Sequence, residues 1–397
     1  MPVGMGSVTR IQRLAALAAL IVLAAGCGTR SAGPARPPAP ATPGAARASA
    51  ATFTLLATGD VLPHNEIIQR SGGDAHGHGH DFRAMFAGVK PVVSGADLAI
   101  CHMETIYGRD GGPFTGYPSF KSPPEVAAAL KDAGYDSCST ASNHTLDDGA
   151  DGVRRTLGAM DAVGLRHAGS ARSAAESGRP ALLRAGPAKV AQLSYTYGTN
   201  GIPLPGKAPW TVNLIDAKKI IADARAARRA GADVVVVSVH WGTEWQPEPD
   251  EQQRTVARTL TASRTAGRPD IDLILGTHAH VPQAYEKVNG TWVVYGMGDQ
   301  LAGRMFNHSD QPDGRGNESS MARFTFAGPS APGGRWTVRK AEFLPQLTDI
   351  SDGFRVVNLN AALARQPGRA DYLRARDAIR TIVLSRGAAR NGLIMSK

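Results

Sequence analysis

The sequence predicts an α/β fold in which two β-sheets pack face to face with helices on their outer sides. From Thr52 onward, apolar runs of strand length alternate with helical stretches, which is the pattern of α/β domains. A later region, from about 281 to 343, has strand-like runs without helices between them and predicts a second, partly antiparallel sheet. With 397 residues, of which 42% are hydrophobic, the chain can bury a sizeable core.

Each element follows from a local pattern. Short apolar runs bounded by turn residues predict strands over 52–59, 97–103, 135–142, 165–169, 180–186, 188–196, 234–240, 271–276, 284–288 and 291–298. Helical spacing predicts helices over 81–95, 123–134, 149–164, 212–232, 250–266 and 359–384. The helix over 123–134 opens with prolines and ends in glycine, the asymmetry expected of a helix.

The N-terminal region has the pattern of an export signal. Arg10 and Arg13 precede an apolar run that is too short to span a membrane, and Gly26-Cys27 follows it. This order resembles a bacterial lipobox, which predicts a signal peptide over 1–26 and a lipid on Cys27. The alternative is an ordinary secretory signal with an incidental cysteine. The Pro- and Ala-rich segment 27–51 is expected to be a linker that holds a folded domain off the outer face of the bacterial cytoplasmic membrane.

The charge favours anionic partners. The formal charge is +10, and residues 1–26 contain two arginines and no acids, so removing them leaves +8. An exported cation is suited to the anionic polymers and lipids of a cell envelope. Nucleic acid is not an expected partner, because no run of Lys or Arg is interleaved with aromatic residues. The alternative explanation is a composition that is simply rich in arginine.

Two further cysteines, Cys101 and Cys138, lie in apolar runs. If the two strands are neighbours, an exported location permits a disulfide between them. Small buried free thiols are an equally good interpretation.

Polar residues follow five of the apolar runs. Ligands of α/β proteins bind just beyond the carboxyl ends of such strands, so these residues are expected to form one site. They are Asp60, Glu104, Asn143 with His144, His240, and His278 with His280. Each one alone could be a turn residue, a helix cap or a buried histidine, but together they favour a convergent site.

Carboxylate, amide and imidazole groups are suited to divalent Mn, Fe, Zn or Co. His278 and His280 are two residues apart, and in extended backbone both would face the same side. One bridging carboxylate with several imidazoles is what two adjacent metal ions need, and such a pair can activate water and hold a phosphoryl group.

Six segments then show a resemblance. GDV, HMET, SNHTLDDG, HWGTEW, GTHAHVPQ and YGMGD, in this order over about 53–302, closely resemble the bacterial CapA family of capsule and poly-γ-glutamate synthesis proteins. That family resembles the calcineurin-like metallophosphoesterases. The resemblance implies a four-layer α/β/β/α sandwich over 52–345, with a C-terminal helical extension over 346–397.

The resemblance also implies roles for individual residues. Asp60 matches the first metal-binding aspartate, Glu104 stands where the phosphoesterases have a bridging aspartate, and Asn143 matches the metal-binding asparagine. His240, His278 and His280 match the remaining metal-binding histidines. His144 matches the histidine that contacts or protonates the substrate, and Asp147 is the nearest residue that could orient it.

The sequence also departs from the family pattern. Leu62 stands where the first phosphoesterase motif has a histidine, and His64 is the candidate substitute. Thr277 stands where many CapA-type chains have a further histidine. Asp299 stands where asparagine is usual. Together with His64, the residues His102, Glu244 and Asp299 are expected to contact substrate or metal.

The predicted function is that of an exported lipoprotein in the synthesis or processing of a capsule or another anionic polymer. A pair of divalent metal ions would support hydrolysis of a phosphoester or of a glutamyl amide. The alternative is a non-catalytic accessory subunit that binds metal or polymer beside a membrane-bound polymer synthase or exporter. The missing histidine at position 62 favours this alternative, and the intact Asn-His and His-x-His motifs favour the enzyme.

Overall fold

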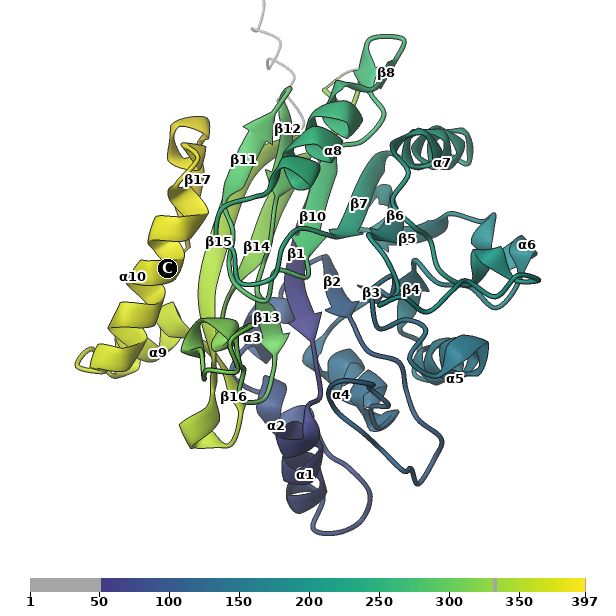
Figure 1. Cartoon of the computed structure of the whole chain (residues 1–397). Helices are drawn as coiled ribbons and strands as arrows, with labels where there is room; N and C mark the ends of the chain where they lie inside the picture. Colours follow the sequence, from purple (N-terminus) through teal and green to yellow (C-terminus); the bar gives the residue numbers. More distant parts are fainter. Residues whose placement is uncertain (1–50, 331–333, 397) are drawn as a thin grey trace, which may run out of the picture. The chain divides into compact units, whose positions relative to one another are not determined.

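Two β-sheets form the centre of the computed structural model, which describes residues 51–330 and 334–396 (Figure 1). The predicted signal peptide, Cys27 and the linker up to residue 50 lie outside these residues. The larger sheet has the strand order β16-β15-β14-β1-β2-β3-β4, with β13 beside β1 and β17 beside β15. The smaller sheet has the order β11-β12-β10-β7-β6-β5.

The strands of the larger sheet are β1 (Thr52–Val61), β2 (Leu98–Met103), β3 (Ser137–Ser139), β4 (Arg166–Ala168), β13 (Asp299–Leu301), β14 (Glu318–Ala327), β15 (Thr337–Asp349), β16 (Arg355–Asn358) and β17 (Leu393–Met395). Those of the smaller sheet are β5 (Ala181–Ala185), β6 (Ala188–Thr196), β7 (Val234–His240), β10 (Leu273–Thr277), β11 (Tyr285–Val288) and β12 (Thr291–Val294). A separate hairpin joins β8 (Arg264–Thr265) and β9 (Arg268–Pro269).

The α-helices are α1 (Asn65–Asp74), α2 (Arg83–Phe86), α3 (Lys90–Val93), α4 (Glu125–Ala133), α5 (Gly149–Ala162), α6 (Ala174–Ser177), α7 (Ala217–Arg229), α8 (Glu251–Ala262), α9 (Leu359–Arg365) and α10 (Ala370–Leu384). Capping residues fix several of their ends. Asp250 and Gln253 form a reciprocal capping box at the start of α8. Gly134 ends α4 in the left-handed conformation, where a Cβ would lie 2.6 Å from the backbone of Ser94.

Three hydrophobic clusters define the layers. The cluster between the sheets joins residues such as Leu55 of β1 and Val236 of β7, and α9 and α10 extend it. A second cluster packs α1 to α4 on the outer face of the larger sheet, and a third packs α7 and α8 on the outer face of the smaller sheet. The order helix, sheet, sheet, helix confirms the predicted four-layer sandwich (Figure 1).

Strand β1 shows how the sequence produces this arrangement. Its alternate residues Phe53, Leu55 and Ala57 face the space between the sheets, and Leu56 faces the outer helices. Successive side chains of a strand point to opposite faces, so a strand buried on both sides reads as a continuous apolar run. The same reasoning applies to β7, all of whose residues are buried.

Some expected elements differ from those observed. The strands of 281–343 do not form a sheet of their own: β11 and β12 join the smaller sheet, while β14 pairs antiparallel with β1 in the larger one. The helix expected over 81–95 is broken into α2 and α3, and α1 was not predicted. The segment 346–397 is less purely helical than predicted, because β16 and β17 both hydrogen-bond to β15.

A disulfide joins Cys101 to Cys138. These residues are direct partners in the parallel register of β2 and β3, with Cα atoms 4.4 Å apart. This separation lies within the range that a disulfide requires. The structure therefore contains the first of the two alternatives that the sequence left open. Within the described ranges, none of the helices combines the length and apolar character that crossing a membrane requires.

Candidate metal centre

Carboxylate and imidazole side chains converge at the carboxyl ends of the central strands. They form three groups, and within each group the ligand atoms lie within 4.8 Å of one another. Three residues, Asp60, Glu104 and His280, each belong to two of these groups, so the groups form one continuous cluster. The cluster consists of Asp60, His102, Glu104, His240, His278, His280 and Asp299.

Glycines allow the two segments that carry Asp60 and Asp299 to lie side by side. The Asp60 backbone N–H donates to the Gly298 carbonyl at 3.1 Å, and Asp60 pairs with Asp299 in the register of β1 and β13. A Cβ at Gly59 would lie 1.7 Å from the Gly298 oxygen. The glycine before Asp60 is therefore needed for close approach of the two backbones.

The cluster contains many buried atoms without a hydrogen-bond partner. They are Asp60 Oδ1, His102 Nε2, both carboxylate oxygens of Glu104, His278 Nδ1 and Asp299 Oδ2. Buried polar groups are normally paired, and a set of unpaired oxygen and nitrogen atoms at one point needs an explanation. Their chemistry fits divalent transition metals, which accept both carboxylate and imidazole ligands.

The electrostatics of the cluster lead to the same conclusion. Burial, and then the Asp299 charge, raise the pKa of Asp60 to about 7. Burial and the neighbouring Asp60 raise the pKa of Glu104 well above its ordinary value. Burial, with His278 beside it, lowers the pKa of His240 well below its ordinary value. In the described part of the chain, the ion-pair partners of Asp60 and Glu104 are all histidines, so a bound cation would supply the missing positive charge.

Asn143 joins the cluster through His240. Its Oδ1 lies 3.0 Å from His240 Nε2, and Thr277 Oγ1 lies 3.0 Å from the other ring nitrogen of His240. Thr277 thus stands beside the cluster as a partner that orients His240, a position that ligand-supporting residues occupy in metal sites. The Asn143 side chain also donates to Asn200 Oδ1 at 3.2 Å.

His278 and His280 come together in a different way from the one predicted. Their backbones are not extended: φ is 95° at His278 and 57° at His280, both in the left-handed region. Non-glycine residues in this region cost about 1–3 kcal/mol each and often mark functional sites. The His278 N–H donates to Asp60 Oδ2 at 3.1 Å, and His280 Nδ1 lies 2.9 Å from Asp299 Oδ1. These contacts hold both rings at the cluster despite the unfavourable backbone.

His144 lies beside the cluster and lines a cleft of about 720 Å³. Its Nδ1 is 2.7 Å from Asp147 Oδ2, and its ring packs edge-on against Phe120 at 4.8 Å. The same Asp147 oxygen accepts the Phe120 N–H at 2.7 Å, which fixes the carboxylate. One ring nitrogen of His144 is therefore held by Asp147, and the other remains available to the cleft.

His102 places an imidazole beside Asp60, where position 62 has none. Leu62 is buried, and His102 is the direct partner of Asp60 in the register of β1 and β2. Its Nε2 lies 3.4 Å from Asp60 Oδ1, and its ring stacks on His240 at 4.8 Å. His64 lines the cleft but belongs to none of the three groups, and its Nδ1 contacts Leu62 O at 3.0 Å.

The neighbours of His102 also determine its tautomer. Ser139 Oγ donates to the Cys101 carbonyl at 3.3 Å, so it accepts a hydrogen bond from His102 Nδ1 at 2.8 Å. A proton on Nδ1 leaves a lone pair on Nε2, the atom that faces Asp60. This is the tautomer that a metal ligand requires.

We therefore expect His102→Ala to lose metal and His64→Ala to keep it. Removing a residue that only supports a ligand lowers metal affinity about 10–100-fold. His102→Ala removes a proposed ligand itself, so its metal affinity should fall by at least this factor. Metal analysis of both purified variants after dialysis against a weak chelator measures the difference. The opposite pattern would assign the missing imidazole to His64.

The remaining predicted contacts lie at the rim. Glu244 Oε1 is 3.9 Å from His278 Nε2, and the Glu244 side chain is partly exposed. Tyr197, which the sequence analysis missed, has its ring 4.5 Å from that of His278. It directly follows the end of β6, so the same search for polar residues beyond strand ends could have found it.

Comparisons with known proteins show the family to which this chain belongs. Residues 54–304 match the family model described as "Bacterial capsule synthesis protein PGA_cap", which confirms the resemblance seen in the motifs. The PGA biosynthesis protein CapA of Bacillus subtilis is 29% identical over 176 residues, which cover 44% of this chain and 44% of that protein. A "probable polyglutamine synthesis accessory protein" of Mycobacterium tuberculosis is 27% identical over 215 residues, which cover 51% and 55%. The chain thus spans about half the length of these curated relatives.

Two solved structures superpose on this chain at low sequence identity. The calcineurin-like phosphoesterase YfkN of Bacillus subtilis superposes with a TM-score of 0.42 at 14% identity, covering 83% of this chain and 100% of that one. The NAD nucleotidase of Haemophilus influenzae superposes with a TM-score of 0.43 at 12% identity, covering 88% and 58%.

Proposed function

Because this chain belongs to the family of bacterial capsule synthesis proteins, we propose that it is a metal-dependent hydrolase of an anionic polymer in the cell envelope. The bond cleaved would be a phosphoester or a glutamyl amide. The names of the relatives, which refer to capsule, PGA and polyglutamine synthesis, support an anionic or glutamyl substrate.

One observation carries the proposal: unpaired buried ligand atoms converge directly beside His144, which lines a cleft. A protein that only binds metal would need the metal-ligating residues and no proton-transferring group beside them. A histidine that is held by Asp147 and faces the same cleft adds what a hydrolase needs, a group that can transfer a proton.

When bound, divalent ions at this site would polarise the ester or amide and supply a nucleophilic water. Asp60, His102, Glu104, Asn143, His240, His278 and His280 would hold them. The remaining steps belong to the chain. Asp147 accepts a hydrogen bond from the Nδ1–H of His144 and stabilises the charged ring, so that the opposite nitrogen can protonate the leaving group. Glu244 lines the cleft, and Tyr197 lies against His278.

Purified protein tests the proposal directly. Metal content is measured first, and the metal-loaded protein is then assayed on a small phosphodiester and on poly-γ-glutamate. Turnover that disappears on chelation and returns with metal is expected. If the protein carries metal but cleaves neither substrate, the proposal of an enzyme is wrong. The protein would then be a non-catalytic accessory subunit of a membrane-bound polymer synthase or exporter.

The names of two relatives, which refer to PGA and capsule biosynthesis, support a location in the cell envelope. We propose that Cys27 carries a lipid that anchors the protein at the outer face of the cytoplasmic membrane. A fatty-acid analogue fed to cells should label the wild-type protein and leave Cys27→Ala unlabelled. Equal labelling of both proteins would contradict lipidation at this residue.

A further inference from the structure

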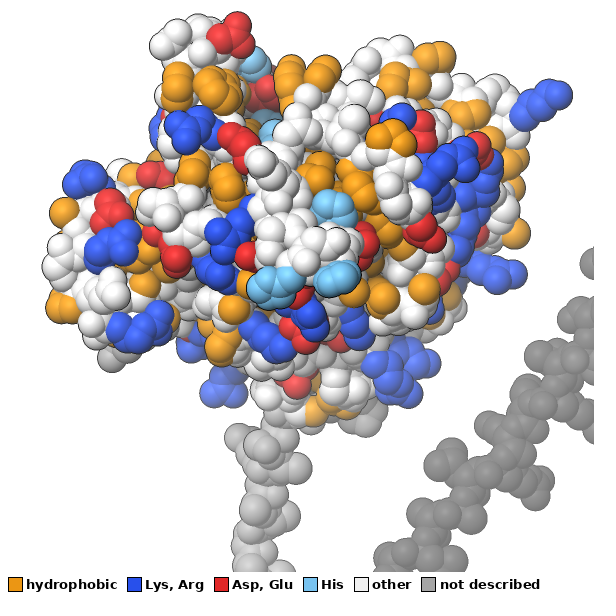
Figure 2. All heavy atoms as spheres, turned by 90° about the horizontal axis from the view of Figure 1, so that it is seen from below, with side chains coloured by type: hydrophobic (Ala, Val, Ile, Leu, Met, Phe, Trp, Pro, Cys, Tyr) orange, Lys and Arg blue, Asp and Glu red, His pale blue; other side chains and the backbone are white. Residues whose placement is uncertain are grey.

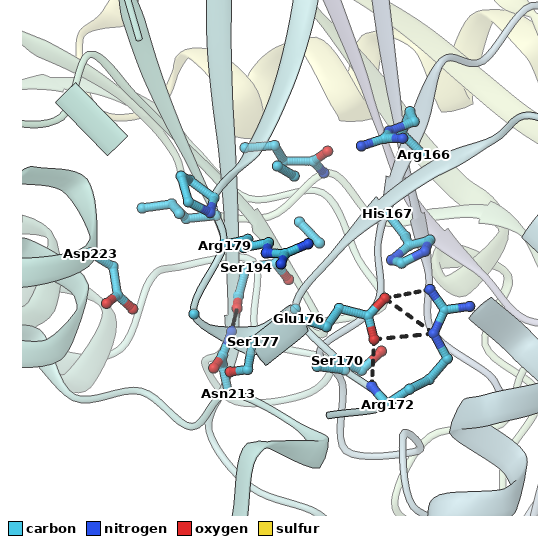
Figure 3. Close-up of a pocket in the computed structure, with 18 of the residues that line it drawn as sticks. Arg166, His167, Ser170, Arg172, Glu176, Ser177, Arg179, Ser194, Asn213 and Asp223 are labelled. Atoms are coloured by element: carbon cyan, nitrogen blue, oxygen red, sulfur yellow. Dashed lines mark hydrogen bonds and ion pairs between the residues drawn. The ribbon is translucent and has the colours of Figure 1, made fainter. Parts of the chain in front are cut away.

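A second cavity, of about 580 Å³, lies apart from the metal centre. It lies beside the edge strands β4 and β5, with β6 along its floor and α6 at its rim (Figure 3). None of the residues in the three candidate metal groups lines it. Any ligand of this cavity would therefore be bound by residues other than those of the metal centre.

Three arginines and three acidic residues line this cavity, and one of the acids, Asp223, pairs with Lys219 outside it. Arg172 is neutralised, because it pairs with Asp161 at 2.6 Å and also with Glu176. Arg166 and Arg179 also line the cavity, and among the ion pairs of the described residues neither of them has a carboxylate partner. Figure 3 shows the Arg179 side chain between Ser194 and the Arg172–Glu176 pair.

The surface on this side of the molecule is basic as well. Figure 2 shows lysine and arginine side chains gathered on the right flank of the molecule. Figure 1 is related to this view by a turn about the horizontal axis, and it places α5, α6 and α7 on the same side.

The floor of the cavity offers polar groups that nothing satisfies. Ser194 is 1% exposed and Gln192 is fully buried, yet neither Ser194 Oγ nor Gln192 Nε2 has a hydrogen-bond partner. The Gln192 Oε1 already accepts from Ser137 at 2.5 Å, so the amide nitrogen is the free end. Unpaired buried donors next to unpaired arginines are what a ligand rich in acceptor oxygens would satisfy.

The same strand leads from this cavity to the metal centre. Ser194 lies two residues before Thr196 on β6, and Thr196 is the register partner of His240 on β7. At about 3.3 Å per residue, roughly 7 Å of strand separates the two positions. The cavity is therefore close to the metal centre along the strand, while its lining shares no residue with the cleft beside His144.

We propose that this cavity binds carboxylates of an anionic chain and so anchors a polymer beside the metal centre. Guanidinium groups recognise carboxylates by paired hydrogen bonds, and Arg166 and Arg179 would each take one side chain of the polymer. The choice of a carboxylate polymer rests on the proposed function, whereas the anion site itself rests on the cavity.

Binding of an oligo-γ-glutamate to the metal-free full chain tests this proposal, because chelation removes any contribution from the metal centre. The double variant Arg166→Ala/Arg179→Ala should bind at least tenfold more weakly, since hydrogen bonds to charged groups are worth about 1.5–3 kcal/mol. The matched control Arg374→Ala/Arg380→Ala removes two exposed arginines from α10 and should bind like the wild type. Equal affinity in both double variants would overturn the proposal.

Two further measurements identify the ligand and separate this proposal from the proposed function. Inorganic phosphate should compete weakly, and competition as strong as that of the oligomer would overturn the polymer assignment. The Arg166→Ala/Arg179→Ala variant should keep full metal content and full turnover of a small phosphodiester. Loss of this turnover would show that the cavity is not a separate anchoring site.

Discussion

His144→Ala is expected to keep its metal and to lose about 10²–10⁴-fold in turnover of a phosphodiester, the usual contribution of a positioned proton donor. The ring contacts Asp147 and Phe120 and belongs to none of the metal groups, so its removal leaves the ligand set intact. Turnover and metal content of the same preparation measure both parts of this expectation. His78→Ala removes an exposed histidine outside the cleft and serves as the control.

The leaving group gives a second check on His144. A substrate whose leaving group needs no proton should lose less activity in the variant than one with a poor leaving group. Asp147→Asn should show the same preference in weaker form, because Asp147 acts through the ring. Loss of metal from His144→Ala would mean that His144 is a ligand.

Glu104→Gln is expected to have the largest effect on metal binding. Glu104 belongs to two of the three groups, and both of its oxygens are unpaired, so it is the carboxylate best placed to bridge two ions. Metal content should fall further than in His102→Ala, while the circular dichroism spectrum stays unchanged. As a control, Glu318→Gln changes a partly buried glutamate outside the cluster and should retain metal.

The same variant makes a prediction for the metal-free protein. The folded-state pKa of Glu104 is raised above its ordinary value of 4.5, so its contribution to stability is complete below that pH and is lost as the pH rises. Asp60, raised from 3.8 to about 7, acts in the same direction. Thermal unfolding without metal should show a smaller loss of stability with rising pH in Glu104→Gln than in the wild type. Identical pH profiles would mean that Glu104 is not held in a charge-repelling environment.

The sequence was sufficient for the layers of the fold and for most of the cluster. Apolar runs mark strands that are buried on both faces, and parallel strands bring their carboxyl ends to one edge. Asp60, Glu104, His240 and the His-x-His pair could therefore be predicted to meet. The division of 281–343 between two sheets could not, because it depends on the long-range pairing of β14 with β1.

The position of His102 illustrates the same limit. The sequence placed His64 nearer to Asp60 along the chain, but the register of β1 and β2 sets His102 directly beside it. Similarly, the left-handed backbone at His278 and His280 accompanies contacts with Asp60, 218 residues from His278, and with Asp299, 19 residues from His280. Spacing along the chain predicts which residue types meet, whereas register determines which of two candidates does so.

The disulfide ties together two of the strands that lead to the metal centre. It joins β2 and β3 at the position directly before the His102–Ser139 pair, and these two strands lead to Glu104 and Asn143. The two cysteines are 37 residues apart in sequence. In the chain-entropy model, a disulfide across such a loop lowers the entropy of the unfolded chain and stabilises the folded state by about 4 kcal/mol. A chain with both thiols reduced lacks this restriction, so we expect it to hold Glu104 and Asn143 less firmly in place. Reduction of the protein should therefore weaken its metal binding.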